Sequence, residues 1–308
     1  MTPANDFPKE DPVRSAVTIG AEIVGWSAGN ALGFLFGGPV GSAAGGAAGV
    51  IISRSLVAAG AEVCERILSP REKARVGAAL AVAAERTQER LANGDHVRED
   101  GFFSDGTDRP PIEEVTEGLL LAAQRAYDEK KVQYIGRMSA NLNFRPDLNV
   151  QSASVLVRFA DQLSYQQMCL LRLCQDNATG RQLKAGKADL QVKSPAHGAL
   201  LSDLLELERL GFINNGGTAV LGLSDVDPPA MRLQLFGIHL YSLMELGNIP
   251  DEDIDALRAT LEAPEPQYIK TRPAEMEGNE HLSFGPNNLS ESPTSQLTTV
   301  RTLPNGAI

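Results

Sequence analysis

The amino-acid sequence predicts a mainly α-helical protein. Long patterns of leucine and alanine recur at helical spacing, whereas valine-rich runs with strict alternation are scarce. Alanine and glycine are abundant, and aromatic residues make up only 5% of the chain. The clearest departure from the helical pattern is a short β-hairpin signal close to residues 212–221.

Composition divides the 308 residues into five parts, which is room for about two domains of ordinary size. The final part is rich in Pro, Ser, Thr, Asn and Glu and has no apolar period, so we expect it to be disordered. The expected parts are a flexible amino terminus (1–12), a glycine-rich helical hairpin (13–68), a helical bundle (69–163), a second mainly helical domain (164–262) and the tail (263–308).

The glycine-rich part carries a regular row of glycines. Between Ile23 and Ser53 there are thirty-one residues without a charged side chain. Residues four apart on a helix lie on one face, so glycines at this spacing form a flat groove that another backbone can approach closely. The glycines that fall at every fourth position are Gly25, Gly29, Gly33, Gly37, Gly41, Gly45 and Gly49.

The break at Gly37-Gly38-Pro39 predicts that this part folds back on itself as a hairpin. Glu22 and Arg54 each lie sixteen residues from Gly38, so an antiparallel hairpin would place them at one height, where they could form an ion pair.

Three arrangements of the hairpin region stay open. Each arm reaches the ~20 residues of a membrane-spanning helix only if it includes Glu22 or Arg54. One long, tilted and kinked helix would have ~46 Å of uncharged length. A buried alanine–glycine hairpin in a soluble bundle is the third arrangement. Basic residues follow the segment, which would place that side in the cytoplasm.

The central part has ordinary helical signals. Ser69 and Glu72 form a capping box with Pro70 between them, and Asn93-Gly94 ends that helix. A polar loop over 95–109 holds the pair Phe102-Phe103, which either plugs into the domain's own core or contacts a partner. Further helices are expected from Pro110 to about Asn143 and from about Val150 to Leu163.

The carboxy-terminal domain opens with a second capping box, Ser164 to Gln167. Further helices follow Ser194-Pro195 and run from about Leu233 to Leu246, and a hairpin turns at Asn214–Gly217 towards 219–221. This order over 164–247 resembles a winged-helix domain, a family in which a basic helix enters the DNA major groove.

The helix in that recognition position, 196–210, is acidic here, which disfavours contact with phosphates. A basic cluster beside it could contact a phosphate backbone or an acidic partner; it consists of Arg181, Lys184, Lys187 and Lys193. A protein-contact or sensing role therefore fits this domain better than DNA binding does.

No catalytic motif emerges from the chain. The net charge is −11, which argues against a nucleic-acid-coating protein. The glycines match neither a phosphate-binding loop nor a dinucleotide fingerprint. The four histidines are far apart in sequence, and the three cysteines, Cys64, Cys169 and Cys174, form no CxxC pair. We therefore expect no enzyme, no cofactor and no metal site, and reduced, mostly buried thiols.

The row over 15–62 resembles the glycine-zipper segments of oligomeric membrane and pore-forming proteins. That resemblance implies a non-enzymatic effector that assembles with copies of itself, contacts membrane lipid and perturbs or permeabilises the bacterial inner membrane from its cytoplasmic face. A membrane element joined to a cytoplasmic sensing part is a plan found among bacterial toxins and phage-defence effectors. The alternative is a soluble, cytoplasmic adaptor or transcription-type regulator that binds protein or nucleic acid through the winged-helix-like part.

Overall fold

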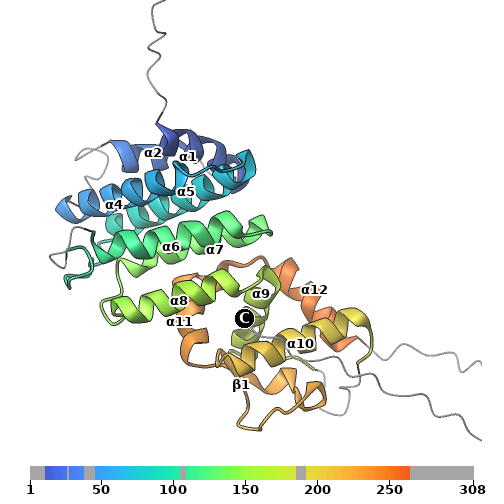
Figure 1. The fold of residues 1–308 in the computed structure, drawn as a ribbon. Coiled ribbons are helices and arrows are strands. Elements are labelled where there is room, and N and C mark those ends of the chain that lie inside the picture. Colours follow the sequence, from blue (N-terminus) through green and yellow to red (C-terminus); the bar gives the residue numbers. More distant parts are fainter. Residues whose placement is uncertain (1–10, 26–27, 38–45, 105–108, 185–191, 264–308) are drawn as a thin grey trace, which may run out of the picture. The chain divides into compact units, whose positions relative to one another are not determined.

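Helices make up most of the chain that the structure describes, as the sequence predicts (Figure 1). The computed structural model describes residues 11–25, 28–37, 46–104, 109–184 and 192–263. All of them belong to residues 1–266, one of the two units into which the chain divides. One two-stranded sheet is present among these residues.

Three helices form the described amino-terminal part: α1 (Pro12–Ile23), α2 (Ala28–Phe36) and α4 (Gly46–Cys64). Asp11 caps α1, because its carboxylate accepts the amide hydrogens of Val13 and Arg14. The sequence predicts one unbroken helical pattern as far as Phe36, and this is wrong. The chain turns at Gly25, whose φ of 68° is left-handed and ends α1.

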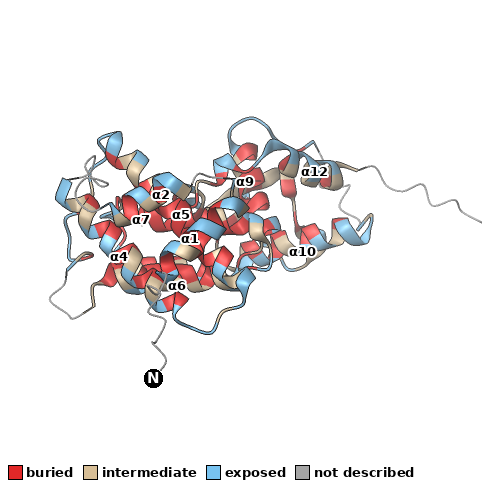
Figure 2. Ribbon diagram, turned by 90° about the horizontal axis from the view of Figure 1, so that it is seen from above, coloured by how far each residue is buried: buried red, intermediate tan, exposed pale blue. Residues whose placement is uncertain are grey.

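Helix α5 (Pro70–Ala92) lies at the centre of this part of the protein and contacts α1, α2, α4, α6 and α7 (Figure 2). Its predicted capping box is confirmed. The Ser69 hydroxyl accepts the amide hydrogen of Glu72, and the Glu72 carboxylate accepts that of Ser69 at 2.8 Å. Residues 76–84, all alanine, valine, leucine or glycine, are buried without a break.

The closest helix contact is the crossing of α1 over α5. A Cβ added at Gly20 would lie 2.0 Å from the amide nitrogen of Ala78, and one added at Gly77 would lie 1.7 Å from the carbonyl oxygen of Ala16. Only glycine allows two helix backbones this close. The small-residue packing that the sequence predicts does occur, but it is made by glycines outside the predicted row.

The next helices are α6 (Pro111–Arg125), α7 (Val132–Leu142) and α8 (Val150–Gln162). The predicted single helix from Pro110 to Asn143 is wrong. Ala126 is extended, and Asp128 then caps a 3₁₀ turn at Glu129–Lys131 that leads into α7. The Ala126 carbonyl left at the end of α6 accepts a hydrogen bond from Arg75. The break lets α6 and α7 pack against each other.

The carboxy-terminal part contains α9 (Tyr165–Ala178), α10 (Pro195–Arg209), β1 (Ile213–Asn215), β2 (Met231–Leu233), α11 (Leu235–Leu243) and α12 (Asp251–Glu262). Short 3₁₀ turns lie at Leu223–Asp225, Pro228–Ala230 and Leu246–Asn248. The Ser164–Gln167 capping box at the start of α9 is confirmed, because both of its reciprocal hydrogen bonds form.

The predicted strand at 219–221 is wrong. Strand β1 pairs antiparallel with β2, in the register Ile213 to Leu233. Gly216 and Gly217 do turn the chain, with φ of 63° and 85°. Leu221, however, is 85% exposed and does not reach the core, whereas Met231 is fully buried. The partner strand is therefore the segment whose side chain reaches the core, and the winged-helix resemblance of this domain stays a prediction.

The segment 13–68, expected as a unit of its own, shares its core with the bundle. Val17 of α1, Phe34 of α2 and Ile52 of α4 are at most 1% exposed and belong to the same buried cluster as α5. The expected tail lies outside the described residues from residue 264 onwards.

Candidate membrane and assembly site

Helix α4 is the one helix of the described residues that is long and apolar enough to cross a membrane. It has 19 residues, and length and composition alone support this interpretation. A core helix of a soluble protein passes the same test, and half of α4 is buried, including Ile52, Leu56 and Val63. In this structure α4 packs as a core helix against α5 and α6.

The two charges of the predicted hairpin, Glu22 and Arg54, do not meet. Both residues are exposed, and neither forms an ion pair with any residue that the structure describes. The ion pair was expected on the assumption of two long antiparallel arms, and the turn at Gly25 shortens the first arm. Arg54 therefore faces solvent beside the buried side chains of Ser53 and Ser55.

The predicted glycine row is split among three settings. Gly25 lies in the turn after α1, and Gly49 is buried in α4. Gly29, Gly33 and Gly37 lie along α2 and just past its end, and all three are exposed. Gly41 and Gly45 lie outside the described residues.

Helix α2 therefore has two unlike faces. Ala31, Phe34 and Leu35 are buried against the rest of the protein, whereas Gly29 and Gly33 point away from it. Apart from its own helix backbone, no atom of the described residues lies within 4 Å of a Cβ added at Gly33. A glycine inside a helix costs about 1 kcal/mol relative to alanine. At Gly20 and Gly77 the close crossing explains the glycine, but at Gly33 no contact with another described residue does.

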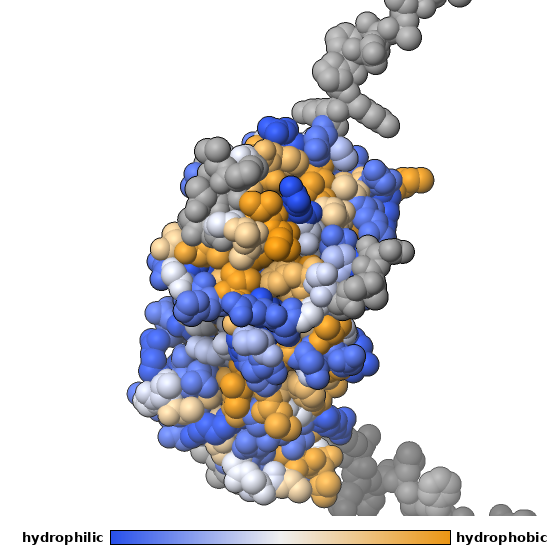
Figure 3. Space-filling view, turned by 90° about the vertical axis from the view of Figure 1, so that its left-hand side faces the viewer, coloured by the Kyte–Doolittle hydropathy of each residue, from blue (hydrophilic) through white to orange (hydrophobic). Residues whose placement is uncertain are grey.

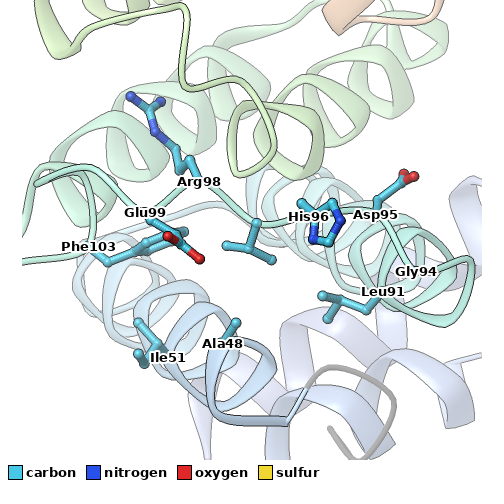
Figure 4. Close-up of a pocket in the computed structure, with 10 residues that line it drawn as sticks. Ala48, Ile51, Leu91, Gly94, Asp95, His96, Arg98, Glu99 and Phe103 are labelled. Atoms are coloured by element: carbon cyan, nitrogen blue, oxygen red, sulfur yellow. The ribbon is translucent and has the colours of Figure 1, made fainter.

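A groove of about 430 Å³ lies beside α4 (Figure 4). Ala48 and Ile51 of α4 and Leu91 of α5 form its apolar side, and Phe103 lies across from them. Asp95, His96 and Glu99 supply charged and polar groups at its edge. Ile51 is 43% exposed. Figure 3 shows apolar side chains gathered in the upper half of one face of the molecule, between charged ones.

The predicted pair Phe102-Phe103 divides between core and surface. Phe102 is 1% exposed, so it plugs into the core and offers no partner contact. Phe103 is half-buried and lines the groove. The residue that holds Phe102 is Arg98, whose guanidinium lies 4.0 Å from the ring centre and donates to the Leu148 carbonyl at 2.7 Å. Arg98 is itself 3% exposed, and its place in a charged stretch of the sequence does not predict this burial.

The predicted basic cluster is partly occupied by the chain itself. Arg181 lies 3.6 Å from the Asp251 carboxylate, and Lys193 donates to the Ala263 carbonyl at 2.7 Å, just past the end of α12. The amide hydrogen of Lys184 is accepted by Glu262. Lys187 lies outside the described residues. The cluster thus stabilises α12 and offers less positive charge to a partner than its sequence indicates.

The three cysteines are buried and form no disulfide. Burial raises the pKa of both Cys169 and Cys174 to about 12, so these thiols stay protonated and unreactive. Within the described part of the chain, no group of three metal-ligating side chains converges.

No protein-family model, curated protein or solved structure matches this chain.

Proposed function

We propose that this protein is a non-enzymatic, membrane-associated effector that assembles through the exposed glycine face of α2 and perturbs the bacterial inner membrane. The observation that carries the proposal is the open side of Gly33, where no packing contact with the described part of the chain accounts for a helix-weakening residue. A second helix packed along Gly29, Gly33 and Gly37 would supply that reason.

Helix α4 is the proposed membrane-entering element, and in the described structure it is packed away. Entry would require α4 to leave α5 and α6, so the packed form corresponds to a resting state. Ion pairs lie at its end: Arg109 bridges Glu62 of α4 at 2.8 Å and the partly buried Glu117 of α6 at 2.6 Å. The pair with the exposed Glu62 contributes little stability, which suits a contact that a trigger must release.

The rest of the described chain, from α5 onwards, would hold this resting state until a trigger acts on it. A high protein concentration, as in overexpressing bacteria, favours assembly by mass action and takes the place of that trigger in the tests. Because α1, α2 and α4 cover α5, deleting residues 1–62 would leave the buried alanine face of α5 bare. The test therefore uses substitutions in the full chain.

The experiment is membrane fractionation of the full chain in bacteria, followed by an alkaline carbonate wash and chemical cross-linking. The test variant replaces Gly29, Gly33 and Gly37 with leucine. Its control is Gly222→Leu, because Gly222 also has open space around an added Cβ but lies outside α2. We expect wild type and control to resist the wash as cross-linked oligomers, and the α2 variant to lose the oligomers. A wild type that washes off, or an α2 variant that still cross-links, would refute the proposal.

A second candidate function, a soluble adaptor, has its own observation. At the start of α11, Leu235 is 68% exposed, Ile238 is 53% exposed and Phe236 lies beside them. Leu235 also has a φ of 38°, a backbone conformation that is strained for any residue other than glycine. If the wild type is found in the soluble fraction, this apolar end of α11 becomes the first surface to test for a protein partner. DNA binding by this domain would appear as a shift in the electrophoretic mobility of DNA at low salt. Arg181→Gln and Lys184→Gln would abolish that mobility shift.

A further inference from the structure

A second cavity, with a polar lining, lies where α5, the end of α7 and the end of α11 meet. It shares one lining residue, Asp95, with the groove beside α4. Its volume is about 250 Å³. Three arginines from two elements line it: Arg86 and Arg90 of α5, and Arg145 from the turn after α7. Asp95, Asn141, Ser242 and Glu245 complete the polar lining.

Each of the three guanidinium groups is held in place by hydrogen bonds to carboxylates. Arg86 donates from Nε to Glu245 at 2.7 Å and from Nη1 to Glu89 at 2.8 Å. Arg145 donates from Nε and Nη2 to the two oxygens of Asp147 at 2.7 and 2.6 Å.

Arg90 is held from three directions. Its Nε donates to Asp95 at 2.6 Å, its Nη1 donates to Asn141 at 2.9 Å, and its guanidinium lies 4.2 Å from the centre of the Phe144 ring. Asn141 is itself 3% exposed and donates to the Leu243 carbonyl at 2.8 Å. These contacts fix the orientation of Arg90 before any ligand arrives.

Every one of these arginines keeps a terminal nitrogen with no acceptor among the described residues. These nitrogens are Nη2 of Arg86, Nη2 of Arg90 and Nη1 of Arg145. Because the other nitrogens are occupied, the unpaired N–H groups are the ones left to meet a ligand in the cavity. The Ser242 side chain is exposed at the same cavity and can add a hydroxyl.

Carboxylates pair with all three arginines. Arg86 donates to Glu245 and Glu89, Arg90 to Asp95 and Arg145 to Asp147, and Glu245 also accepts from Arg137. What the cavity offers a ligand is therefore the three outward N–H groups rather than a surplus of positive charge, and a small anion with several acceptor oxygens fits them. Guanidinium groups match phosphate in geometry as well as in charge.

We propose that this cavity binds the phosphate group of a small ligand. The volume is below the range of pockets for drug-sized molecules, so the ligand is a phosphate or a compact phosphate ester rather than a long chain. The site goes beyond the membrane proposal and does not depend on it. Because its residues come from α5, α7 and α11, a bound phosphate would tie these elements together and stabilise the folded chain.

The test is isothermal titration calorimetry of the full chain with inorganic phosphate and with glycerol 3-phosphate, at constant ionic strength. Arg145→Gln is the first variant, because Arg145 lies in the turn after α7, outside the helices, and pairs with the exposed Asp147. Its control is Arg125→Gln. Arg125 also donates from two nitrogens to one aspartate, Asp161, but it does not line this cavity.

We expect Arg145→Gln to weaken phosphate binding at least about tenfold and Arg125→Gln to leave it within about twofold. Ser242→Gln, which narrows the cavity without removing a charge, keeps the test valid if Arg145→Gln folds poorly; it too should weaken binding.

A parallel arm separates the two sources of a phosphate group. Full chain is incubated with vesicles of phosphatidylcholine alone and with phosphatidic acid added. Binding of the soluble phosphates that Arg145→Gln weakens assigns a soluble ligand. Binding only to the phosphatidic acid vesicles, again weakened by Arg145→Gln, assigns a lipid headgroup. No binding in either arm, or an equal loss in Arg125→Gln, would overturn the proposal.

Discussion

At the scale of single residues, glycine has two different roles in this protein. Gly20 and Gly77 let α1 and α5 cross with their backbones in contact, and a side chain at either position has no room. Gly33 lies on an open helix face, where a side chain would meet nothing. The spacing of the glycines in the sequence reveals that a row exists. It does not reveal which glycines face inwards, because that depends on where α5 lies.

The first prediction compares these two roles. Gly33→Ala should raise the free energy of unfolding by about 0.5–1 kcal/mol, because alanine favours the helix and nothing opposes its methyl group. Gly77→Ala should lower it by several kcal/mol, because the methyl group would force α1 away from α5. Urea unfolding of the purified full chain measures both. Equal effects in the two variants would contradict the assignment of inward and outward glycines.

Lys131, directly before α7, is a second residue whose burial the sequence does not reveal. The sequence predicts a solvated charge, but Lys131 is 5% exposed and donates to the Asp161 carbonyl at 2.7 Å. Burial lowers its pKa from 10.5 to about 8, with Arg125 acting in the same direction and Asp161 opposing.

A pH dependence of stability follows from Lys131. The unfolded chain binds this proton up to a pH near 10.5, whereas the folded chain releases it near 8, so stability rises with pH between these values. Lys131→Met should remove this rise, which is on the order of 3 kcal/mol. Thermal unfolding of wild type and variant from pH 7 to 10 measures it. Parallel pH profiles would show that the lysine keeps an ordinary pKa in the folded chain.

At the scale of elements, local chemistry in the sequence predicts where helices begin better than where they end. The capping boxes at Ser69 and Ser164 lie within one residue of the start of α5 and α9. The breaks at Gly25 and Ala126 carry weaker local signals, and packing against α5 and α7 decides them. The partner of β1 depends on a residue that reaches the core from fifteen or more positions away, which a local turn signal cannot specify.

Glu245 is a residue that joins separate elements directly, and no pattern in the sequence predicts this role. Its carboxylate accepts from Arg86 of α5 at 2.7 Å, from Arg137 of α7 at 2.8 Å and from Asn141 of α7 at 2.9 Å. Burial raises its pKa, but these hydrogen bonds outweigh burial and hold the pKa below the ordinary value. The stability that these hydrogen bonds contribute is present above the ordinary pKa of a glutamate. It is lost as the pH falls from that value through the lower pKa of Glu245 in the folded chain.

Glu245→Gln tests this junction. We expect the free energy of unfolding at pH 7 to fall by about 3 kcal/mol, because two arginines lose their shared carboxylate at a half-buried position. Glu129→Gln is the matched control, since its partner Arg71 is 74% exposed, and it should change stability by less than about 1 kcal/mol. Equal losses in the two variants would mean that the Glu245 network carries no special stability.

At the scale of the whole molecule, the predicted mainly α-helical class is confirmed, whereas the predicted hairpin, winged-helix and domain divisions stay predictions. Helices α1, α2 and α4 share one buried cluster with α5, so the apolar residues of 13–68 are largely used inside the chain. The sequence pattern alone cannot distinguish an apolar helix that packs on α5 from one that enters a membrane. Among the described residues, the exposed face of α2 is the surface that we propose for contact with another copy.

The most direct test of the membrane proposal is dye release from vesicles of bacterial-type lipids by the full chain. It is measured over rising protein concentration, because mass action favours assembly. The variants are Gly33→Leu and the control Gly222→Leu, each checked for native stability. We expect wild type and control to release dye with a steep concentration dependence, and folded Gly33→Leu to release little. Release by Gly33→Leu equal to that of wild type, or no release by wild type at any concentration, would contradict the proposal.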